Sequence, residues 1–351
     1  MEFSRVQHYL TSRLGKPVVV RSVKRSFPGA SRETWLIRCE AEGGREEGFV
    51  LRVDPPEGAG CAGDLKQEFA VYAKLFQSEV PVAEPLWYDE GQDMCEGRPH
   101  MVRRMVDGSS NVAGLFDDDA DAPARRRAVA YECIEKLALV HKLDWKAHGF
   151  DALLPAPDNA ARSFAHELAI WKDHWRTRRP FPSPVLEETL SWLSEIVPHD
   201  TPRISLVKGN NGLGEEIWQG EKIVAMSDWE LACLSDGISD LFWSQGTMRL
   251  IGFEEVLRRY EEAMGQRVSF ERLVYANAFA LAKQYISSIA FWYVPFHERR
   301  TTKPYAFTAL SYMAGYDDKL ARCLGRPLDE VWQIVNGGEK SMYLAFGGSR
   351  K

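Results

Sequence analysis

The chain has 351 residues, of which 45% are hydrophobic and 27% charged, proportions typical of a globular protein with room for two lobes and two cores. Its formal net charge of −6 argues against nucleic acid as the main partner. The six cysteines form no C-x-x-C pair, and no apolar run is long enough to cross a membrane. The N-terminus is amphipathic and charged, unlike a signal peptide. We therefore expect a reduced, cytoplasmic protein without a membrane or nucleic-acid partner.

The N-terminal part of the sequence predicts a helix followed by a small, mostly β unit. Apolar side chains recur at helical spacing over residues 4–14. Strands are then predicted over residues 18–23, 34–39, 49–53, 86–88 and 100–104. A turn that contains Gly29 joins the first two strands, and the backbone N–H groups of such a turn can close over phosphates. One helix, from about residue 64 to residue 76, follows the third strand.

Helices dominate the rest of the chain. They are predicted over residues 125–142, 164–176, 186–196, 252–265, 270–294, 301–324 and 328–336. Tryptophans on their apolar faces are expected to pack in the core. His141, at the end of the first of these helices, is expected to pack or to cap rather than to act as a base. The end of the long helix is aromatic, with Phe291, Trp292 and Phe296.

The most informative stretch runs from Arg203 to Trp243. An apolar run ends in a loop that contains Asn210, and two short strands follow at residues 216–219 and 222–226. Asp228 comes two residues after the end of the second strand. In phosphoryl-transfer sites, one polar loop residue orients the nucleophile, a second holds metal, and an acid beyond the hairpin holds the metal that bridges the phosphates. The order of residues here predicts such a site.

A longer pattern begins at Asp228 and continues through a segment that we expect to be helical. The residues of this pattern are Asp228, Trp229, Glu230, Ala232, Asp236, Asp240, Leu241 and Trp243. With this pattern the chain resembles the aminoglycoside phosphotransferase-like family, and within it a branch of small-molecule phosphotransferases associated with acyl-CoA dehydrogenases. The resemblance implies an α+β, protein-kinase-like fold with two lobes.

The resemblance also implies where each lobe begins and ends. Residues 1–106 would form a small nucleotide-binding lobe with an antiparallel β-sheet and one key helix, and residues 107–351 a larger, mostly helical lobe with acceptor-binding helices. The larger lobe would carry a catalytic loop at residues 206–216 and a metal-binding segment at residues 226–230.

The resemblance also assigns residues that bind the nucleotide phosphates. The family's glycine-containing turn matches residues 29–35, where Ser31 would approach the phosphates. Arg52, on the third strand, matches the cation that grips phosphate, and Glu68 on the next helix matches its carboxylate partner. The implied cofactors are ATP and Mg²⁺, and GTP is left open as the donor.

A second set of residues is implied for the base of the nucleotide. Residues 100–108 match the strand that leads into the hinge between the lobes. Arg104 and Val106 lie in this segment, and backbone groups there would hold adenine.

The catalytic loop departs from the family pattern at its functional positions. Lys208 stands where the family has histidine, Asn210 where it has the catalytic aspartate, and Glu215 where it has a metal-binding asparagine. Asparagine can orient a hydroxyl but cannot take up its proton at neutral pH. Loss of a general base typically forfeits ~10²–10⁴ in rate. Glu215 remains a suitable ligand for Mg²⁺, together with Asp228.

Three functions fit this loop, and the first is favoured. It is an ATP-dependent phosphotransferase that acts on a small-molecule hydroxyl. A phenol, which is already acidic, would lose least without the base, and the aromatic C-terminal helices favour a flat, apolar acceptor. Lys208 would then stabilise a phenolate or the transferring phosphate, or Glu216 or Asp236 would supply the base from a shifted position. The second function is a pseudokinase that acts through a partner, and the third is a subunit to which another chain delivers phosphate.

Overall fold

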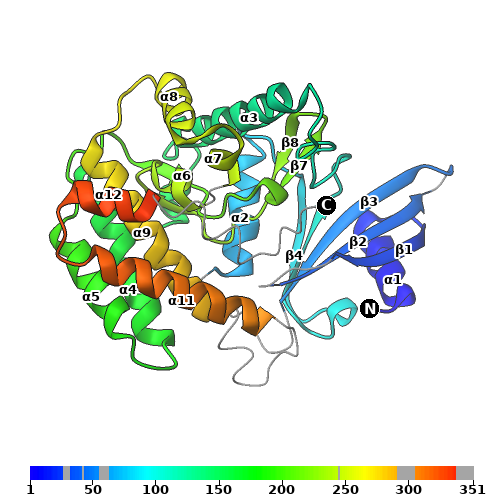
Figure 1. Cartoon of the computed structure of the whole chain (residues 1–351). Helices are drawn as coiled ribbons and strands as arrows, with labels where there is room; N and C mark the ends of the chain where they lie inside the picture. Colours follow the sequence, from blue (N-terminus) through cyan, green and yellow to red (C-terminus); the bar gives the residue numbers. More distant parts are fainter. Residues whose placement is uncertain (27–31, 42, 55–62, 244–245, 291–304, 337–351) are drawn as a thin grey trace.

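The computed structural model describes residues 1–26, 32–41, 43–54, 63–243, 246–290 and 305–336. The chain forms a β-rich lobe and a helical lobe, as the sequence predicts (Figure 1). In Figure 1 the strands β1, β2 and β3 lie with helix α1 on one side of the molecule. The helices α4, α5, α9, α11 and α12 lie on the other side, with α2 and β4 between the two groups. None of the helices in these described ranges is long and apolar enough to cross a membrane.

The smaller lobe is built on a five-stranded antiparallel sheet with the strand order β1-β2-β3-β5-β4. The strands are β1 (Val18–Ser26), β2 (Glu33–Ala41), β3 (Glu46–Val53), β4 (Pro85–Asp89) and β5 (His100–Arg104). Each contains the range predicted for it. Because side chains alternate along a strand, Phe49 and Leu51 of β3 share one face, where they are fully buried against α1 (Phe3–Leu14).

The other face of the sheet points toward the site. Val50 and Arg52 of β3 lie on this face, and the pairing of Val50 with Arg103 places Arg103 beside them. Helix α2 (Leu65–Leu75) packs against the same face, because its Tyr72 shares a buried core with the inward side chains of β5. The aspartate that precedes α2 accepts a bond from the backbone of the helix and so begins it. The sheet therefore presents its polar side chains to α2 and to the second lobe.

The larger lobe is organised around one buried helix. Its helices are α3 (Ala122–Lys142), α4 (Ser163–Arg178), α5 (Pro184–Glu195), α6 (Ser239–Trp243), α7 (Gly246–Ile251), α8 (Phe253–Met264), α9 (Phe270–Ser288), α11 (Tyr305–Cys323) and α12 (Leu328–Asn336). Helix α9 is buried on nearly all sides, which fits its apolar sequence, and contacts α6, α11 and α12. The predicted aromatic end of this helix, from Phe291 to Phe296, lies outside the described residues.

A pair of short strands and a hairpin carry the stretch that the sequence singled out. Strand β6 (Ser205–Val207) pairs with β9 (Cys233–Ser235), and β7 (Glu216–Gln219) pairs with β8 (Lys222–Met226). The bounds of β7 and β8 are those predicted. The expected catalytic loop lies between β6 and β7 and ends in a single 3₁₀ turn, Leu213–Glu215.

The prediction for the segment after Asp228 was partly wrong. We expected a helix that carries both Asp236 and Asp240, but the structure has strand β9 and a turn before α6 begins at Ser239. The reason is local. The side chain of Asp236 accepts a bond of 3.0 Å from the backbone N–H of Ile238, and such a bond competes with helix formation. Helix α7 was also absent from the prediction.

Candidate active site

A cavity of about 890 Å³ lies between the two lobes, and we call it the interlobe cleft. Its walls come from the inner face of the sheet, the segment after β5, the loop between β6 and β7, and the helices α6, α9 and α11. Residues predicted for the site are found in this lining: Arg52, Arg104, Val106, Asn210, Glu215 and Asp228. Glu68 lies behind Arg52, and Ser31 is outside the described residues.

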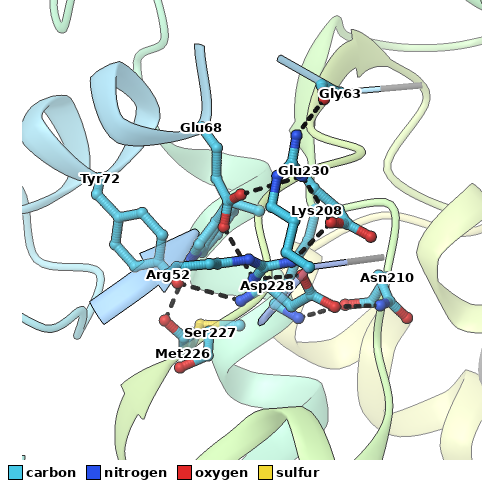
Figure 2. Close-up of polar contacts among 12 residues, drawn as sticks. Arg52, Gly63, Glu68, Tyr72, Lys208, Asn210, Met226, Ser227, Asp228 and Glu230 are labelled. Atoms are coloured by element: carbon cyan, nitrogen blue, oxygen red, sulfur yellow. Dashed lines mark hydrogen bonds and ion pairs between the residues drawn. The ribbon is translucent and has the colours of Figure 1, made fainter. Parts of the chain in front are cut away.

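Arg52 joins the sheet to the acidic segment of the larger lobe (Figure 2). Its Nη1 donates to Oδ1 of Asp228 at 2.9 Å, and its Nη2 donates to Oε2 of Glu230 at 2.6 Å. Oε1 of Glu68, on α2, lies 3.1 Å from Nη1. Burial opposes the charge of Arg52, but the three carboxylates outweigh that effect and raise its pKa well above the ordinary value. The predicted pairing of Arg52 with Glu68 is therefore present in the structure.

A second buried arginine, Arg32, completes this ion-pair cluster. It is 2% exposed, and it donates to Glu230 at 2.9 Å and to Asp54 at 2.7 Å. A third bond, of 2.5 Å, goes to the backbone oxygen of Gly63, just before α2. Sequence reasoning did not assign a role to Arg32, because only the fold brings the start of β2 against Glu230. Removing one partner of a buried ion pair of this kind strongly destabilises the folded protein.

Asp228 lies just after the hairpin of β7 and β8, and it lines the cleft. Its backbone has φ +63°, a left-handed conformation that is strained for a residue with a side chain. The backbone N–H of Asp228 donates to the hydroxyl of Tyr72 on α2 at 3.1 Å, which helps to hold this conformation. Burial tends to raise the pKa of Asp228, but Arg52 and Lys208 lower it below the ordinary value. The group is therefore an anion at neutral pH.

Asn210 is held in one orientation by two partners. Its Nδ2 donates to Oδ2 of Asp228 at 2.5 Å (Figure 2), and its Oδ1 accepts a bond of 2.9 Å from the indole N–H of Trp243. The loop itself is fixed at Gly209, which has φ +84°. A Cβ there would lie 2.5 Å from the backbone oxygen of Leu231. The amide that replaces the family's aspartate therefore lies against the carboxylate expected to hold metal.

Lys208 is fully buried, and its contacts stabilise the loop. Its ammonium donates to the backbone oxygen of Asn210 and lies 3.3 Å from a carboxylate oxygen of Glu216. The carboxylate of Asp240 accepts the backbone N–H groups of Lys208 and Gly209, at 2.8 and 2.9 Å. The action of Lys208 on a phenolate or on the transferring phosphate stays a prediction.

The two carboxylates proposed as substitute bases both have other partners. Glu216 is paired with Lys208 and also accepts the backbone N–H of Ser227 at 3.2 Å. Asp236 receives two bonds of 2.8 Å from Arg272 and one of 2.9 Å from Thr201. These contacts do not favour either residue as the base.

Glu215 is the carboxylate of the loop that lines the cleft. Burial, with the charge of Asp228 as the next cause, raises its pKa to about 7. A cation that binds between two neighbouring carboxylates relieves the electrostatic repulsion between them. Glu215 and Asp228 both line the cleft, and their binding of a divalent cation stays a prediction.

His141 is buried and packed, as expected. Its Nε2 lies 2.9 Å from Oδ2 of Asp240, and its Nδ1 lies 2.9 Å from the hydroxyl of Tyr260. His141 therefore braces the carboxylate that holds the backbone of the catalytic loop.

The segment after β5 forms the hinge side of the cleft. The side chain of Arg104 turns to the outer face of the sheet, where it pairs with Glu47 at 3.2 Å and Glu84 at 3.0 Å. Only the backbone of Arg104 is therefore available to a base in the cleft. The backbone N–H of Met105 is bonded to Gly48 on β3, and Val106 follows in the cleft lining.

Another part of the cleft is lined by side chains that the sequence did not single out. Tyr312 and Tyr316 of α11 stack with ring centroids 5.8 Å apart and an interplanar angle of 6°. The hydroxyl of Tyr316 donates to Gln284 of α9, which itself donates to the backbone oxygen of Trp243 at 2.8 Å. A stripe of tyrosines at helical spacing looks like core in a sequence, so only the fold shows that this pair reaches the cleft.

In the described ranges, no group of three or more His, Cys, Asp and Glu side chains is arranged to hold a metal ion by itself. Mg²⁺ is usually bound by one or two carboxylates together with substrate phosphates. The oxygen donors Asp228 and Glu215 fit that mode of binding.

Comparison with curated proteins gives partial relatives. The chain is 26% identical over 225 residues to acyl-CoA dehydrogenase family member 11 of Rattus norvegicus, and 26% identical over 228 residues to family member 10 of Mus musculus. These matches cover 63% and 62% of this chain but only 27% and 19% of the relatives. The chain thus spans about a quarter or less of their length.

Comparison with solved structures supports the fold. A protein described as an aminoglycoside phosphotransferase from Ralstonia eutropha superposes with a TM-score of 0.67 at 16% identity, over 96% of this chain and 98% of that one. A thermostable mutant of aminoglycoside phosphotransferase APH(4)-Ia, in a ternary complex with ADP and hygromycin B, gives a TM-score of 0.58 at 17% identity, over 92% of this chain and 99% of that one. A macrolide 2'-phosphotransferase from Brachybacterium faecium gives 0.54 at 17% identity, over 91% and 97%.

These likenesses confirm the predicted α+β, protein-kinase-like fold. A family model, described as the phosphotransferase enzyme family, matches residues 25–275, which is most of the chain. The chain therefore belongs to the phosphotransferase enzyme family.

Proposed function

We propose that this protein transfers the γ-phosphoryl group of a nucleoside triphosphate to a hydroxyl group of a small molecule. One observation carries the proposal. Arg52, Asn210 and Asp228, which are far apart in the sequence, meet within hydrogen-bonding distance at the wall of a cleft of about 890 Å³. A cation for phosphate, an amide for the acceptor and a carboxylate for metal are what positioning and charge stabilisation of a phosphoryl group require.

The roles on the nucleotide side follow from the contacts. Arg52 would grip the phosphates with Glu68 holding it from behind, and Asp228 and Glu215 would hold Mg²⁺. When bound, the ion would neutralise charge on the phosphates. The similarity of this chain to solved structures favours ATP as the donor, because mutants of APH(4)-Ia have been solved with ADP and with AMP-PNP. The base would lie near Val106, and we place the boundary between the lobes there, at residues 106 and 107.

On the acceptor side, Asn210 would orient the hydroxyl but would not take up its proton. The acceptor would lie between this loop and the tyrosine pair of α11. Tyr312, Tyr316 and Trp243 favour a flat, apolar or aromatic molecule there, and a phenol would need the least help from a base. A panel of phenols, sugars and aliphatic alcohols, with nucleotide consumption as the readout, tests this choice.

One observation favours a second candidate, a nucleotide-binding protein without turnover of its own or a subunit that needs a protein partner. Both carboxylate oxygens of Asp228 are already engaged, one by Arg52 and one by Asn210. We rank this candidate second, because family membership favours an enzyme and a triphosphate offers Arg52 a replacement partner.

A thermal-shift measurement separates these possibilities. A ligand at about 100 times its Kd stabilises the folded protein by about 2.7 kcal/mol. Stabilisation by nucleotide with Mg²⁺, followed by turnover on one class of acceptor, supports the enzyme. Stabilisation with no turnover on any acceptor favours the second candidate. Absence of any shift with ATP or GTP contradicts the enzyme and the nucleotide-binding protein, and it leaves only a subunit that needs its protein partner.

A further inference from the structure

Trp243, the last residue of α6, contacts the catalytic loop through its indole N–H. Its Nε1 donates to Oδ1 of Asn210 at 2.9 Å, and both residues line the interlobe cleft. Asp240, on the same short helix, accepts the backbone N–H groups of Lys208 and Gly209 at 2.8 and 2.9 Å. Helix α6 therefore fixes the backbone of the loop at one residue and the side chain of Asn210 at another.

The two partners of Asn210 permit only one orientation of its amide. The indole N–H of Trp243 donates and cannot accept, whereas the carboxylate of Asp228, an anion at neutral pH, accepts the bond from Nδ2. With the amide reversed, Nδ2 would face the indole N–H and Oδ1 would face the carboxylate. Both hydrogen bonds would be lost together, and polar groups left unpaired in a site shielded from water are costly. Trp243 and Asp228 thus hold the amide in the same sense.

Binding of nucleotide and metal would leave Trp243 as the main restraint on this orientation. Asp228, once its carboxylate binds Mg²⁺ as proposed above, becomes a weaker partner for Nδ2 of Asn210. The reversed amide would then present Oδ1 to the metal, and hard cations favour oxygen ligands. The bond from Trp243 to Oδ1 does not involve Asp228, so it persists and opposes the reversal.

Trp243 is itself held in place by α9 and α11. Nε2 of Gln284 donates to the backbone oxygens of Trp243 at 2.8 Å and Phe242 at 3.4 Å, which are carbonyls that a helix leaves without partners at its C-terminal end. The hydroxyl of Tyr316 donates to Oε1 of Gln284 at 2.8 Å and so fixes which end of that amide faces α6. The ammonium of Lys283 lies 5.8 Å from the centre of the Trp243 ring. These contacts limit the freedom of the indole to follow a reversed amide.

We propose that Trp243 is a positioning residue of the phosphotransferase, which keeps the amide of Asn210 in one orientation while Mg²⁺ and nucleotide are bound. The inference rests on the proposed function and adds a residue that acts on the reaction through Asn210. Its distinguishing feature is chemical. The two ends of an amide differ, whereas the two oxygens of a carboxylate are equivalent, so an aspartate at this position would present oxygen in either orientation. The indole N–H therefore matters for asparagine and much less for aspartate.

The first test is kinetic and uses Trp243→Phe, which keeps an aromatic ring in the cleft and loses the N–H. With Asn210 in place, kcat should fall roughly ten-fold with little change in the KM of the acceptor, as expected when one hydrogen bond is lost. In the Asn210→Asp background, the same substitution should change kcat by about two-fold or less. Trp192→Phe is the matched control, because Trp192 is a buried tryptophan of α5 that does not line the cleft, and it should leave kcat unchanged in both backgrounds.

The second test observes the amide itself and needs no turnover. In protein labelled with ¹⁵N-asparagine, the Nδ2–H signals of Asn210 are identified by their absence from the Asn210→Asp variant. With Mg²⁺ and AMP-PNP or GMP-PNP bound, wild-type protein should give one pair of signals for this amide. Trp243→Phe protein should give a second pair or a displaced pair, because the amide then occupies both orientations. A single pair at the wild-type position in this variant overturns the role of Trp243.

The other outcomes separate this inference from the proposed function. An equal loss of kcat in both backgrounds, or a rise in KM with kcat unchanged, overturns the role of Trp243 and leaves the phosphotransferase intact. Wild-type protein that binds nucleotide without turnover contradicts the enzyme, and the amide signals alone then support or overturn the role of Trp243. Wild-type protein that binds neither nucleotide with Mg²⁺ contradicts both proposals. If Trp243→Phe does not fold, Gln284→Met, which loses the donor to the backbone of Trp243, is measured in the same two backgrounds and should show the same pattern.

Discussion

Nη1 of Arg52 and Oδ1 of Asp228 lie 2.9 Å apart and join the two lobes across the interlobe cleft. The arginine expected to grip phosphate is thus bonded to the carboxylate expected to hold metal. Each of these groups neutralises the other while the cleft has no charged ligand. A metal-bound triphosphate would exchange this bond for two others, since its phosphates fit Arg52 and its cation fits Asp228. Nucleotide and metal are therefore expected to bind together.

The first prediction concerns Asp228. Asp228→Ala removes the carboxylate at the wall of the cleft, and it should lower turnover at least ~10²-fold, because metal-assisted charge stabilisation is the main catalytic term in phosphoryl transfer. Steady-state kinetics and Mg²⁺-dependent thermal shifts measure the loss. Asp158→Ala, at an exposed aspartate, is the control. Unchanged nucleotide affinity and unchanged activity in the Asp228 variant would remove the site assignment.

The second prediction concerns the altered loop. Asn210→Asp restores a base but places a second carboxylate where Nδ2 now donates to Asp228 at 2.5 Å. Without metal, the like charges should lower the free energy of unfolding by about 1–2 kcal/mol. With Mg²⁺, activity on aliphatic alcohols should rise ~10-fold or more, as expected for general-base catalysis. Both effects are measured on one preparation, by urea unfolding and by coupled assay. A loss of activity on every acceptor would instead give Asn210 a role of its own.

The third prediction concerns the acceptor wall. Tyr312→Ala removes one ring of the stacked pair that lines the cleft. For an aromatic acceptor, KM should rise roughly ten-fold with a smaller change in kcat, because a stacked aromatic pair and its buried area contribute about 1–2 kcal/mol to binding. Kinetics with a phenol and with an aliphatic alcohol measure the difference. Phe116→Ala, at an aromatic residue that is 69% exposed, should change neither. Equal losses on both acceptors would argue against an aromatic site.

The fourth prediction concerns stability in acid. The bond from Lys16 to Glu47, supported by Arg45 and Arg104 and opposed by burial, lowers the pKa of Glu47 from 4.5 to about 2. A carboxylate with a lowered pKa stabilises the fold above its ordinary pKa, and this stability is lost as the pH falls from about 4.5 toward 2.

Glu47→Gln should therefore cost about 1–3 kcal/mol in the free energy of unfolding at pH 7. The difference from wild type should shrink as the pH falls below 4.5. Urea titrations at several pH values measure it. Glu46→Gln, at an exposed neighbour on the same strand, is the control and should show no such trend. A difference that stays constant down to pH 3 would show that the effect of Glu47 is not electrostatic.

The sequence allowed much of the fold to be predicted, because its signals are local. Alternating apolar residues gave the strands, and the turn at Gly220 gave the bounds of β7 and β8. Prediction was wrong where a side chain competed with the backbone, as at Asp236, whose bond to Ile238 interrupts the expected helix. Arg52, Glu68 and Asp228 could be proposed from their order along the chain, since a hairpin followed by an acid is itself a pattern.

Other members of the candidate site could not be found in this way. Arg103 and Arg104 are adjacent and identical in the sequence, yet β5 turns one toward the cleft and the other toward Glu47 and Glu84. Arg32 meets Glu230 across 198 positions. The sequence by itself determined the elements, their order and the chemical types available for a site. Only the tertiary structure decided which charges are paired and which face the cleft, because those outcomes depend on distances between segments that no local pattern encodes.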